Sequence, residues 1–222
     1  MQHCFQNHPF ASLMHARTPR KLWMTALLTP ASPPTPALDK ASLRRNLLAT
    51  RQALAADAAQ APHLNALLGE QLARLLSEHC AACVGFYWPM AGEFDARATL
   101  AAWLAGDPGR QAALPVVSSR DAPLTFHVWH PDAAMRMGRY NIPIPAADHP
   151  VQTDLLLVPC VGFDAARLRL GYGGGYYDRT LASLQPRPYT VGLAFECARV
   201  AALPREPHDV PLDLILTETG RY

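Results

Sequence analysis

The stretch of sequence that decides both the fold and the site runs Arg169-Leu170-Gly171-Tyr172-Gly173-Gly174-Gly175-Tyr176-Tyr177-Asp178. It follows an apolar run, residues 155–159, that predicts a buried strand, and it leads into a stretch compatible with a helix, residues 176–184. Glycine lacks a Cβ and tolerates positive φ, so backbone N–H groups can converge on an anion in such a turn. The start of a helix adds partial positive charge. The stretch therefore predicts a phosphate or nucleotide site, and a plain surface turn is the alternative.

Charged residues flank the glycines in a fixed order. Arg169 supplies a cation at the start of the loop, and Asp178 supplies a carboxylate one turn into the helix, where a phosphate-bound Mg²⁺ could sit. The stretch is neither a Walker loop nor a dinucleotide fingerprint, because it contains no GK[ST] and no GxGxxG. We therefore expect a phosphate site of another kind.

The pattern outside the loop predicts alternating helices and strands. Helices are expected at 40–56, 63–79, 94–104 and 176–184, and strands at 84–88, 112–117, 124–129, 155–158, 189–194 and 212–217. Residues 112–117 and 124–129 are expected to pair as neighbours, and residues 131–153 to form a proline-rich loop region. The fold class that follows is α/β, with a mostly parallel sheet flanked by helices on both faces.

The composition suits one domain with an unusual beginning. Half of the 222 residues are hydrophobic, which is enough for a core. Residues 1–37 hold six of the 21 prolines and no acidic residue, so we expect a disordered or mis-started N-terminal extension there and a single domain at 38–222. No apolar run approaches the ~20 residues that a membrane span needs.

Charge and cysteine content limit the partners. Three of the 20 basic residues and none of the 18 acids lie in 1–37, which leaves 17 basic residues against 18 acidic ones in the rest. This balance argues against a general nucleic-acid-binding surface. Cys80 and Cys83 form a lone CxxC without a second pair, so we expect reduced cysteines and a cytoplasmic protein.

A stripe of cations is predicted on the first helix. At 100° per residue, Lys40, Arg44 and Arg51 fall within about 40° of one another, beside leucines that predict the buried face. Such cations can extend their heads into water or reach an anion. Lys40 is the only lysine after residue 37, which favours the anion.

Aromatic and acidic side chains follow the strand at 84–88. Trp88, Glu93 and Asp95 combine a flat apolar surface with carboxylates, which suits a planar heteroaromatic ligand with amino groups. The alternative is that the acids belong to the start of a helix. Trp129 is either a core residue or a stacking wall. Asp209 is either a metal or ribose contact or a loop acid.

Taken in order, these motifs resemble those of the 5-formyltetrahydrofolate cyclo-ligase family. The matching residues are Lys40-x-x-x-Arg44, Gly92-Glu93-Phe94-Asp95, Val158 to Asp164, Arg169 to Asp178, and Pro207-His208-Asp209 with Asp213. The resemblance covers about residues 38–218. It implies ATP- and Mg²⁺-dependent conversion of 5-formyltetrahydrofolate to 5,10-methenyltetrahydrofolate with release of ADP and phosphate. It also implies a fold related to the ribose-phosphate isomerase and CoA-transferase group.

The resemblance implies roles for individual residues. Lys40, Arg44 and Arg169 would contact the triphosphate, Asp178 and Asp209 would hold Mg²⁺, and Arg169, Tyr177 and Asp178 would be catalytic. The loop residues Leu170, Gly171, Tyr172, Gly173, Gly174, Gly175, Tyr176 and Tyr177 would bind the nucleotide. Trp88, Glu93, Trp129, Tyr172, Gly173, Gly174, Gly175 and Tyr176 would bind the folate, which can carry a polyglutamate tail.

The chain departs from the family pattern at three places. Gly174 stands where some members have a lysine, Ala198 stands where a glutamine is common, and Ile142-Pro143-Ile144-Pro145 replaces an Ile-x-Glu-Pro signature. The phosphate charge would then rest more on Lys40 and Arg44.

The residue types fit the implied chemistry. Phosphorylation would turn the formamide oxygen into a good leaving group for attack by N10, and phosphoryl transfer depends on positioning and charge neutralisation. The alternatives are an ATP-independent sugar-phosphate isomerase or CoA-transferase relative, and a non-catalytic folate- or nucleotide-binding protein. We expect a monomer that binds neither nucleic acid nor membranes.

Overall fold

The computed structural model describes residues 39–206 and 209–222, which lie in a unit that spans Pro36–Tyr222. The extension expected at residues 1–37 lies outside the described residues. Within the described ranges, none of the helices has the length and apolar character that crossing a membrane requires.

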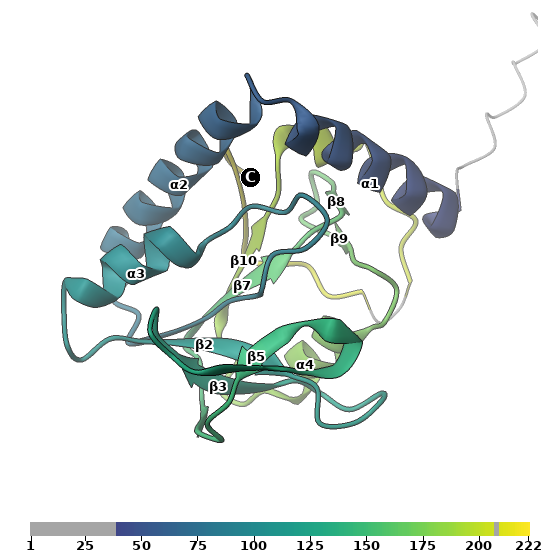
Figure 1. Ribbon diagram of the computed structural model, residues 1–222. Helices are drawn as coiled ribbons and strands as arrows, with labels where there is room; N and C mark the ends of the chain where they lie inside the picture. The colour runs from purple at the N-terminus through teal and green to yellow at the C-terminus, as the bar shows by residue number, and fades with distance from the viewer. Residues whose placement is uncertain (1–38, 207–208) are drawn as a thin grey trace, which may run out of the picture. The chain divides into compact units, whose positions relative to one another are not determined.

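An eight-stranded sheet organises the described residues (Figure 1). Its order is β12-β11-β10-β7-β1-β2-β3-β6. The strands are β1 Cys83–Gly85, β2 Gln111–Val116, β3 Thr125–Trp129, β6 Pro150–Val151, β7 Leu155–Pro159, β10 Tyr189–Leu193, β11 Leu214–Thr217 and β12 Gly220–Arg221. The run β11-β10-β7-β1-β2 is parallel, and the strands beside it are antiparallel. The predicted mostly parallel sheet is therefore confirmed, including the pairing of β2 with β3.

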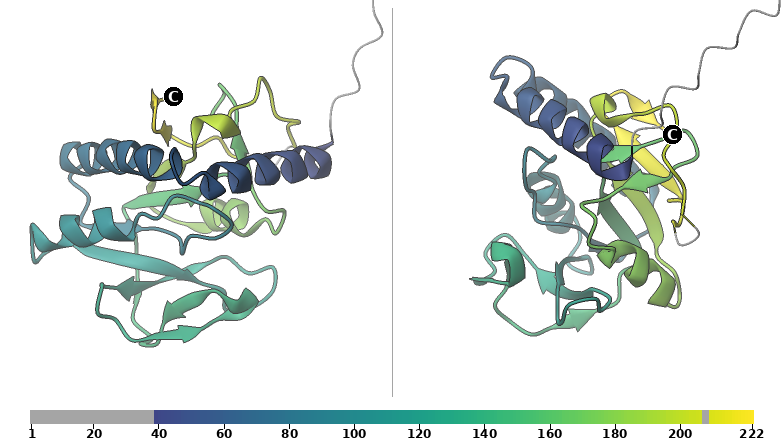
Figure 2. Two further views of the ribbon diagram at one scale, coloured as in Figure 1. Left: turned by 45° about the horizontal axis from the view of Figure 1, so that its top comes forward. Right: turned by 90° about the vertical axis from the view of Figure 1, so that its right-hand side faces the viewer.

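Helices cover both faces of the sheet, as predicted. The helices are α1 Lys40–Ala56, α2 Ala61–Glu78, α3 Arg97–Ala105 and α4 Tyr176–Ser183. Leucines of α2 and α3 share one core with Leu155 and Leu157 of β7, whereas Leu181 of α4 shares another with Leu156 and Val158. The right-hand view of Figure 2 shows α2 and α3 (blue to teal) and α4 (green) on opposite sides of the sheet. Because β7 is buried on both faces, its sequence is a continuous apolar run.

Helix α1 lies over the carboxyl ends of the strands rather than on a face of the sheet (Figure 1). It begins after Asp39, whose carboxylate accepts the Ser42 N–H at 2.8 Å as an N-cap. Leu47 of this helix belongs to a small third core, which also contains Leu168 and Leu170, and Leu43 and Leu48 pack against that core. That core rests on the hairpin of β8 Gly162–Phe163 and β9 Arg169–Leu170.

This hairpin corrects one expectation. No element was predicted between the buried strand and the glycine loop, residues 171–175, but the chain first forms β8 and β9, and the loop begins after β9. Buried Asp164 closes the hairpin turn by accepting the N–H groups of Ala166 and Leu168, and it also accepts the Leu203 N–H. Two-residue strands are too short to give a periodic pattern, so the sequence does not predict them.

In three other regions the elements differ from the prediction by more than two residues. Residues 131–153 are not simply a loop. Strands β4 Met135–Met137 and β5 Pro143–Pro145 pair as a hairpin around the 3-10 turn η1 Arg139–Asn141. Strand β6 pairs with β3 as an edge strand of the sheet. The strand predicted at 84–88 ends at Gly85. The helix predicted from residue 94 begins at Arg97, because the Asp95 carboxylate accepts the Arg97 N–H and turns the chain first.

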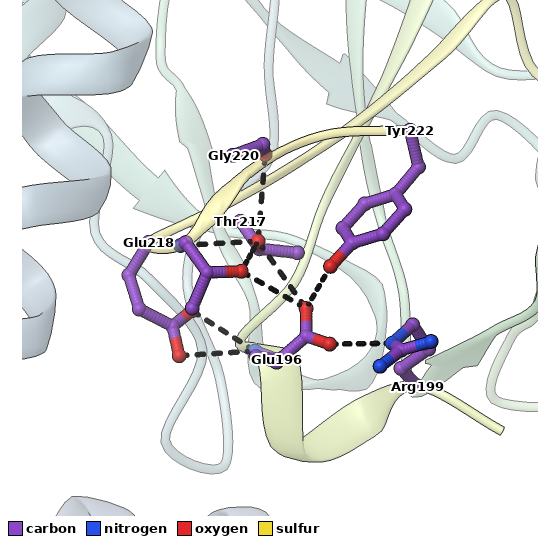
Figure 3. A network of polar contacts seen from close by, with 7 residues as sticks. Glu196, Arg199, Thr217, Glu218, Gly220 and Tyr222 are labelled. Atoms are coloured by element: carbon purple, nitrogen blue, oxygen red, sulfur yellow. Dashed lines mark hydrogen bonds and ion pairs between the residues drawn. The ribbon is translucent and has the colours of Figure 1, made fainter.

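A polar network joins the ends of β10 and β11 (Figure 3). Glu196, in the 3-10 turn η2 Glu196–Ala198, accepts hydrogen bonds from Tyr222 Oη at 2.8 Å and Thr219 Oγ1 at 3.2 Å and pairs with Arg199. Its own N–H donates to the Glu218 carboxylate at 2.9 Å. Burial opposes ionisation, but these donors outweigh it and hold the pKa of Glu196 below its ordinary value. Because Thr219 and Tyr222 flank β12, these hydrogen bonds help to hold β12 at the edge of the sheet.

Candidate functional site

The glycine loop connects β9 to α4 and requires glycine at two positions. Gly173 has φ +95° and Gly175 has φ +65°, both in the region that L side chains rarely adopt. Gly175 is also the N-cap of α4, so the loop runs directly into a helix start. A Cβ added at Gly171 would meet no atom within 4 Å, which leaves open space above that backbone. Leu170, in contrast, is buried and anchors the loop in the third core.

Arg44 of α1 contacts this loop directly. Its Nε donates to the Gly171 carbonyl at 2.6 Å, and its guanidinium carbon lies 3.5 Å from the position of a Cβ built on Gly173. Lys40 lies one turn earlier on the same helix. Its Nζ pairs with Asp209 Oδ2 at 2.8 Å and with Glu206 Oε1 at 3.3 Å. Burial opposes the charge of Lys40, but these carboxylates raise its pKa above the ordinary value.

Glu93 reaches the loop from the other side. Its Oε2 accepts the Met90 N–H at 2.9 Å, and its Oε1 accepts the Tyr172 hydroxyl at 2.7 Å. The Glu93 side chain is 3% exposed and lies 3.6 Å from Arg51 Nη1. Burial raises the pKa of Glu93, although the Tyr172 hydrogen bond and the Arg51 charge act in the opposite direction. The segment after β1, helix α1 and the glycine loop therefore meet at this carboxylate.

Arg169 and Asp178 form an ion pair across the ends of the loop. Arg169 Nη2 lies 2.7 Å from Asp178 Oδ1, and the two side chains are 5% and 25% exposed. Tyr177 lies beside them, with the Arg169 guanidinium carbon 6.0 Å from its ring centre. The Tyr177 hydroxyl is buried and has no hydrogen-bond partner among the described residues. Burial, reinforced by the negative charge of Glu93, raises the pKa of Tyr177.

The remaining aromatic residues occupy different surroundings. Trp88 is half-buried beneath the guanidinium of Arg97, which lies 4.2 Å from its ring centre. Tyr176 starts α4, and its hydroxyl bonds that of Tyr140 at 2.7 Å across to the β4–β5 hairpin. Tyr140 holds a left-handed backbone, with φ +62°.

Trp129 was predicted as a contact for the folate, but the structure places it in the core. The side chain is 5% exposed and packs edge-on against Phe86, with ring centres 5.0 Å apart. The strand register sets Trp129 beside Ala112, near the start of β2, whereas the glycine loop lies at the carboxyl ends of the strands. A substrate contact from this ring is therefore not supported.

The two predicted metal ligands lie in separate ion pairs, Asp178 with Arg169 and Asp209 with Lys40. Across residues 39–206 and 209–222, no three side chains of His, Cys, Asp or Glu gather closely enough to hold a metal ion. A metal here would therefore need ligands beyond the protein, such as phosphate oxygens.

Arg51 is a residue of this site whose partner the sequence does not predict. The helical pattern placed it in the cation stripe with Lys40 and Arg44, but gave no reason to expect its contact with Glu93. A separate groove of about 850 Å³ lies between α2 and α3, and of the residues predicted to face a ligand it is lined by Asp95 but not by Glu93 or Trp88.

Comparisons with known proteins agree with the geometry. A model described as "5-formyltetrahydrofolate cyclo-ligase family" matches residues 37–218. A 5-formyltetrahydrofolate cyclo-ligase of Haemophilus influenzae is 32% identical over 188 residues, which cover 78% of this chain and 91% of that protein. One from Escherichia coli K12 is 39% identical over 116 residues, or 49% of this chain and 64% of that protein.

Two solved structures are similar in fold. The 5,10-methenyltetrahydrofolate synthetase of Mycoplasma pneumoniae superposes with a TM-score of 0.66 at 27% identity, covering 82% of this chain and 99% of its own. That of Aquifex aeolicus gives a TM-score of 0.67 at 28% identity, covering 82% of this chain and 91% of its own.

Proposed function

The chain belongs to the 5-formyltetrahydrofolate cyclo-ligase family, and on that premise we propose that it converts 5-formyltetrahydrofolate to 5,10-methenyltetrahydrofolate with ATP and Mg²⁺, releasing ADP and phosphate. The observation that carries the proposal is that one glycine loop contacts both a cation of α1 and the carboxylate of Glu93. The proposed phosphate-binding surface and the proposed acceptor for ligand N–H groups thus both contact this loop.

The residues present fit a triphosphate. Arg44 lies against the loop, Lys40 stands one turn away, and the backbone at Gly171 borders open space. Left-handed glycines ahead of the α4 helix start can direct backbone N–H groups toward an anion. The proposed role of these residues is to bind the phosphates and to hold them in place during transfer.

When bound, ATP supplies the phosphoryl group that converts the formyl oxygen into a leaving group, so that N10 can close the ring. Arg169, in β9 at the start of the loop, balances the charge of Asp178. Asp178 and Asp209 are the carboxylates that would hold Mg²⁺ together with phosphate oxygens. Each already lies beside a cation, Arg169 for Asp178 and Lys40 for Asp209, which balances its charge.

The folate side of the proposal rests on Glu93. Its Oε1 accepts an O–H from Tyr172, a bond that a pterin N–H can replace with the same donor-to-acceptor sense. Trp88 and Tyr176 are the remaining aromatic candidates for the folate, each with surface exposed.

We also propose that the chain acts as a monomer in the cytoplasm, without a nucleic-acid partner. Cys80, Cys83, Cys160 and Cys197 are all free thiols, which supports a reducing compartment. Sedimentation of the purified chain would test the monomer.

The test is an assay of the methenyl product. The purified chain is mixed with 5-formyltetrahydrofolate and Mg²⁺, with and without ATP, and the rise in absorbance of the product is followed. We expect product only with ATP, together with an equal amount of ADP. Turnover of sugar phosphates or acyl-CoA without ATP would instead support a sugar-phosphate isomerase or a CoA-transferase. Folate binding without product would support a non-catalytic folate-binding protein.

A further inference from the structure

Arg51 lies at the centre of the contacts that join α1, the segment after β1 and the glycine loop. Its Nε donates to the Ala91 carbonyl at 3.1 Å, and its Nη1 donates to the Cys160 carbonyl at 3.3 Å. Its Nη2 donates to the Tyr172 hydroxyl. The side chain is 4% exposed, and Nη1 lies 3.6 Å from Glu93 Oε1. All three nitrogens of the guanidinium therefore have a partner.

The backbone around Glu93 is shaped to receive this guanidinium. Ala91 has φ +48° and Gly92 has φ +77°, so two successive left-handed residues turn the chain just before the carboxylate. A Cβ added at Gly92 would lie 2.8 Å from the Ala55 side chain and 3.3 Å from the Arg51 carbonyl, so the turn sits directly on α1. Strained backbone of this kind persists only where surrounding contacts hold it.

The two oxygens of Glu93 have different partners. Oε2 is bound by the Met90 N–H within the same turn, so it fixes the carboxylate to the backbone. Oε1 faces both Arg51 and the Tyr172 hydroxyl. Tyr172 belongs to the glycine loop and is 40% exposed, whereas Arg51 is buried. Of these two partners, the tyrosine is therefore the one that a ligand can reach from the surface.

We propose that Arg51 is a positioning residue, which holds Glu93 ionised with Oε1 aimed at the point where the Tyr172 hydroxyl now donates and where the folate would donate. This inference rests on the proposed function. A planar guanidinium suits the task because it can bind two backbone carbonyls and a hydroxyl at once, which an ammonium group cannot do in the same geometry. The contact between Arg51 and Glu93 also links α1, which carries the proposed phosphate contacts, to the proposed folate contact.

The other groups that face Glu93 are weak acids. They come from the segment after β1, the end of β7, the glycine loop and α4, and they are Tyr87, Cys160, Tyr172 and Tyr177. Burial is the main reason that the pKa of each lies above its ordinary value, so all four remain neutral at neutral pH. Arg51 is the cation whose charge lowers the pKa of Glu93.

Arg51→Met and Arg51→Lys test the inference, with Arg45→Met as the control because Arg45 is exposed on the same helix. The Michaelis constants for 5-formyltetrahydrofolate and for ATP are measured from pH 5 to 9. For Arg51→Met we expect the Michaelis constant for 5-formyltetrahydrofolate to rise by about tenfold or more. The Michaelis constant for ATP should change by about twofold at most. The acid limb of kcat/KM for folate moves to higher pH, because Glu93 loses the neighbouring charge. Arg51→Lys should keep the acid limb of this pH profile near that of the parent, because the positive charge remains. It should still raise the Michaelis constant for 5-formyltetrahydrofolate.

Equal losses for both substrates with an unmoved acid limb would overturn the inference, since a purely structural role predicts that result. If Arg51→Met does not fold, the Arg51→Lys result decides. Glu93→Gln provides a further check, because adding Arg51→Lys to it should then raise the folate constant little. A parent chain that produces methenyl product while both Arg51 variants behave like Arg45→Met overturns this inference alone. A parent chain without ATP-dependent product overturns the proposed function, and this inference with it.

Discussion

At the scale of single residues, Glu93 has the most unusual surroundings of the site. Its carboxylate is enclosed by the segment after β1 and the glycine loop, and it is balanced by one buried guanidinium. Burial of a carboxylate favours its neutral form, whereas a neighbouring cation and a donated hydrogen bond favour the ionised one. Burial prevails here, so the pKa of Glu93 lies above its ordinary value of 4.5.

This shift predicts the pH dependence of folate use. An ionised Glu93 accepts the ligand N–H, so kcat/KM for folate should fall as pH drops through a pKa above 4.5. The folded chain also keeps this proton to higher pH than the unfolded chain, so the contribution of Glu93 to stability decreases as pH rises through the same window. In Glu93→Gln the acid limb should disappear, with kcat/KM about tenfold lower at neutral pH. A limb at the same pH in parent and variant would assign it to another group.

Asp178 is predicted to serve both metal binding and charge balance. Asp178→Asn keeps the shape of the side chain but leaves buried Arg169 without its counter-charge, so we expect loss of turnover together with about 1–3 kcal/mol of stability. Exposed Asp132→Asn is the matched control. Rates as a function of Mg²⁺ concentration and denaturant melts measure the two effects. Near-normal turnover in a folded Asp178→Asn chain would reject the metal role.

The sequence predicted several of these residues but not their partners. The order of Lys40, Arg44, Glu93 and the glycine loop was readable, because glycines, cations and acids stand out at strand and helix ends. Arg51 was indistinguishable from a cation that extends its head into water, since helical spacing reports a face and not what covers it. Trp129 was ambiguous for the same reason, and the strand register resolved it.

At the scale of elements, the glycine loop is held by its neighbours on both sides. Leu170 anchors its beginning in the third core, Arg44 binds the Gly171 carbonyl, and α4 begins at its end. The loop is therefore fixed at its ends, with open space above Gly171.

Two alanine substitutions separate conformation from ligand access in this loop. Gly173→Ala forces a methyl group onto a left-handed residue beside Arg44, so we expect a loss of about 1 kcal/mol. Gly171→Ala meets no atom and should leave stability within about 0.5 kcal/mol, yet it should raise the Michaelis constant for ATP by filling the space beside the phosphates. Thermal melts and initial rates measure both. Unchanged ATP kinetics in Gly171→Ala would place the nucleotide elsewhere.

The network at Glu196 is predicted to be structural. Glu196→Gln should lower stability by about 1–3 kcal/mol while leaving kcat/KM within about twofold of the parent. The folded-state pKa lies below the ordinary 4.5, so the advantage of the parent is present above that pH and is lost as pH falls through the lowered value. Denaturant melts at several pH values measure it, with Tyr222→Phe as a milder variant. A large loss of activity at unchanged stability would move this network into the functional site.

Long periodic elements were predictable and short ones were not. The helices α1 and α2 and the strands β2, β3 and β7 lie within a residue or two of their predicted bounds, because each has a core-facing pattern several residues long. The hairpins β4–β5 and β8–β9 have strands of three and two residues, set by local turns and by packing on neighbours. Sequence periodicity carries no signal at that length.

At the scale of the whole described unit, the parallel strands bring distant segments to one edge. The residues after β1, β7 and β10 are far apart in the chain, yet Arg51 of α1 bonds the first two directly and α1 packs on the third. Ligands of open α/β sheets gather outside the carboxyl ends of the strands. The sheet thus supplies the meeting point, and α1 supplies the cations that complete it.

The most direct test follows the formyl oxygen through one turnover. The chain is incubated with 5-formyltetrahydrofolate labelled with oxygen-18 in the formyl group, together with unlabelled ATP and Mg²⁺, and the released phosphate is analysed by mass spectrometry. Phosphorylation of the formyl oxygen predicts one labelled oxygen atom in each phosphate. Unlabelled phosphate alongside the methenyl product would show that ATP is hydrolysed without activating the formyl group, and would contradict this account.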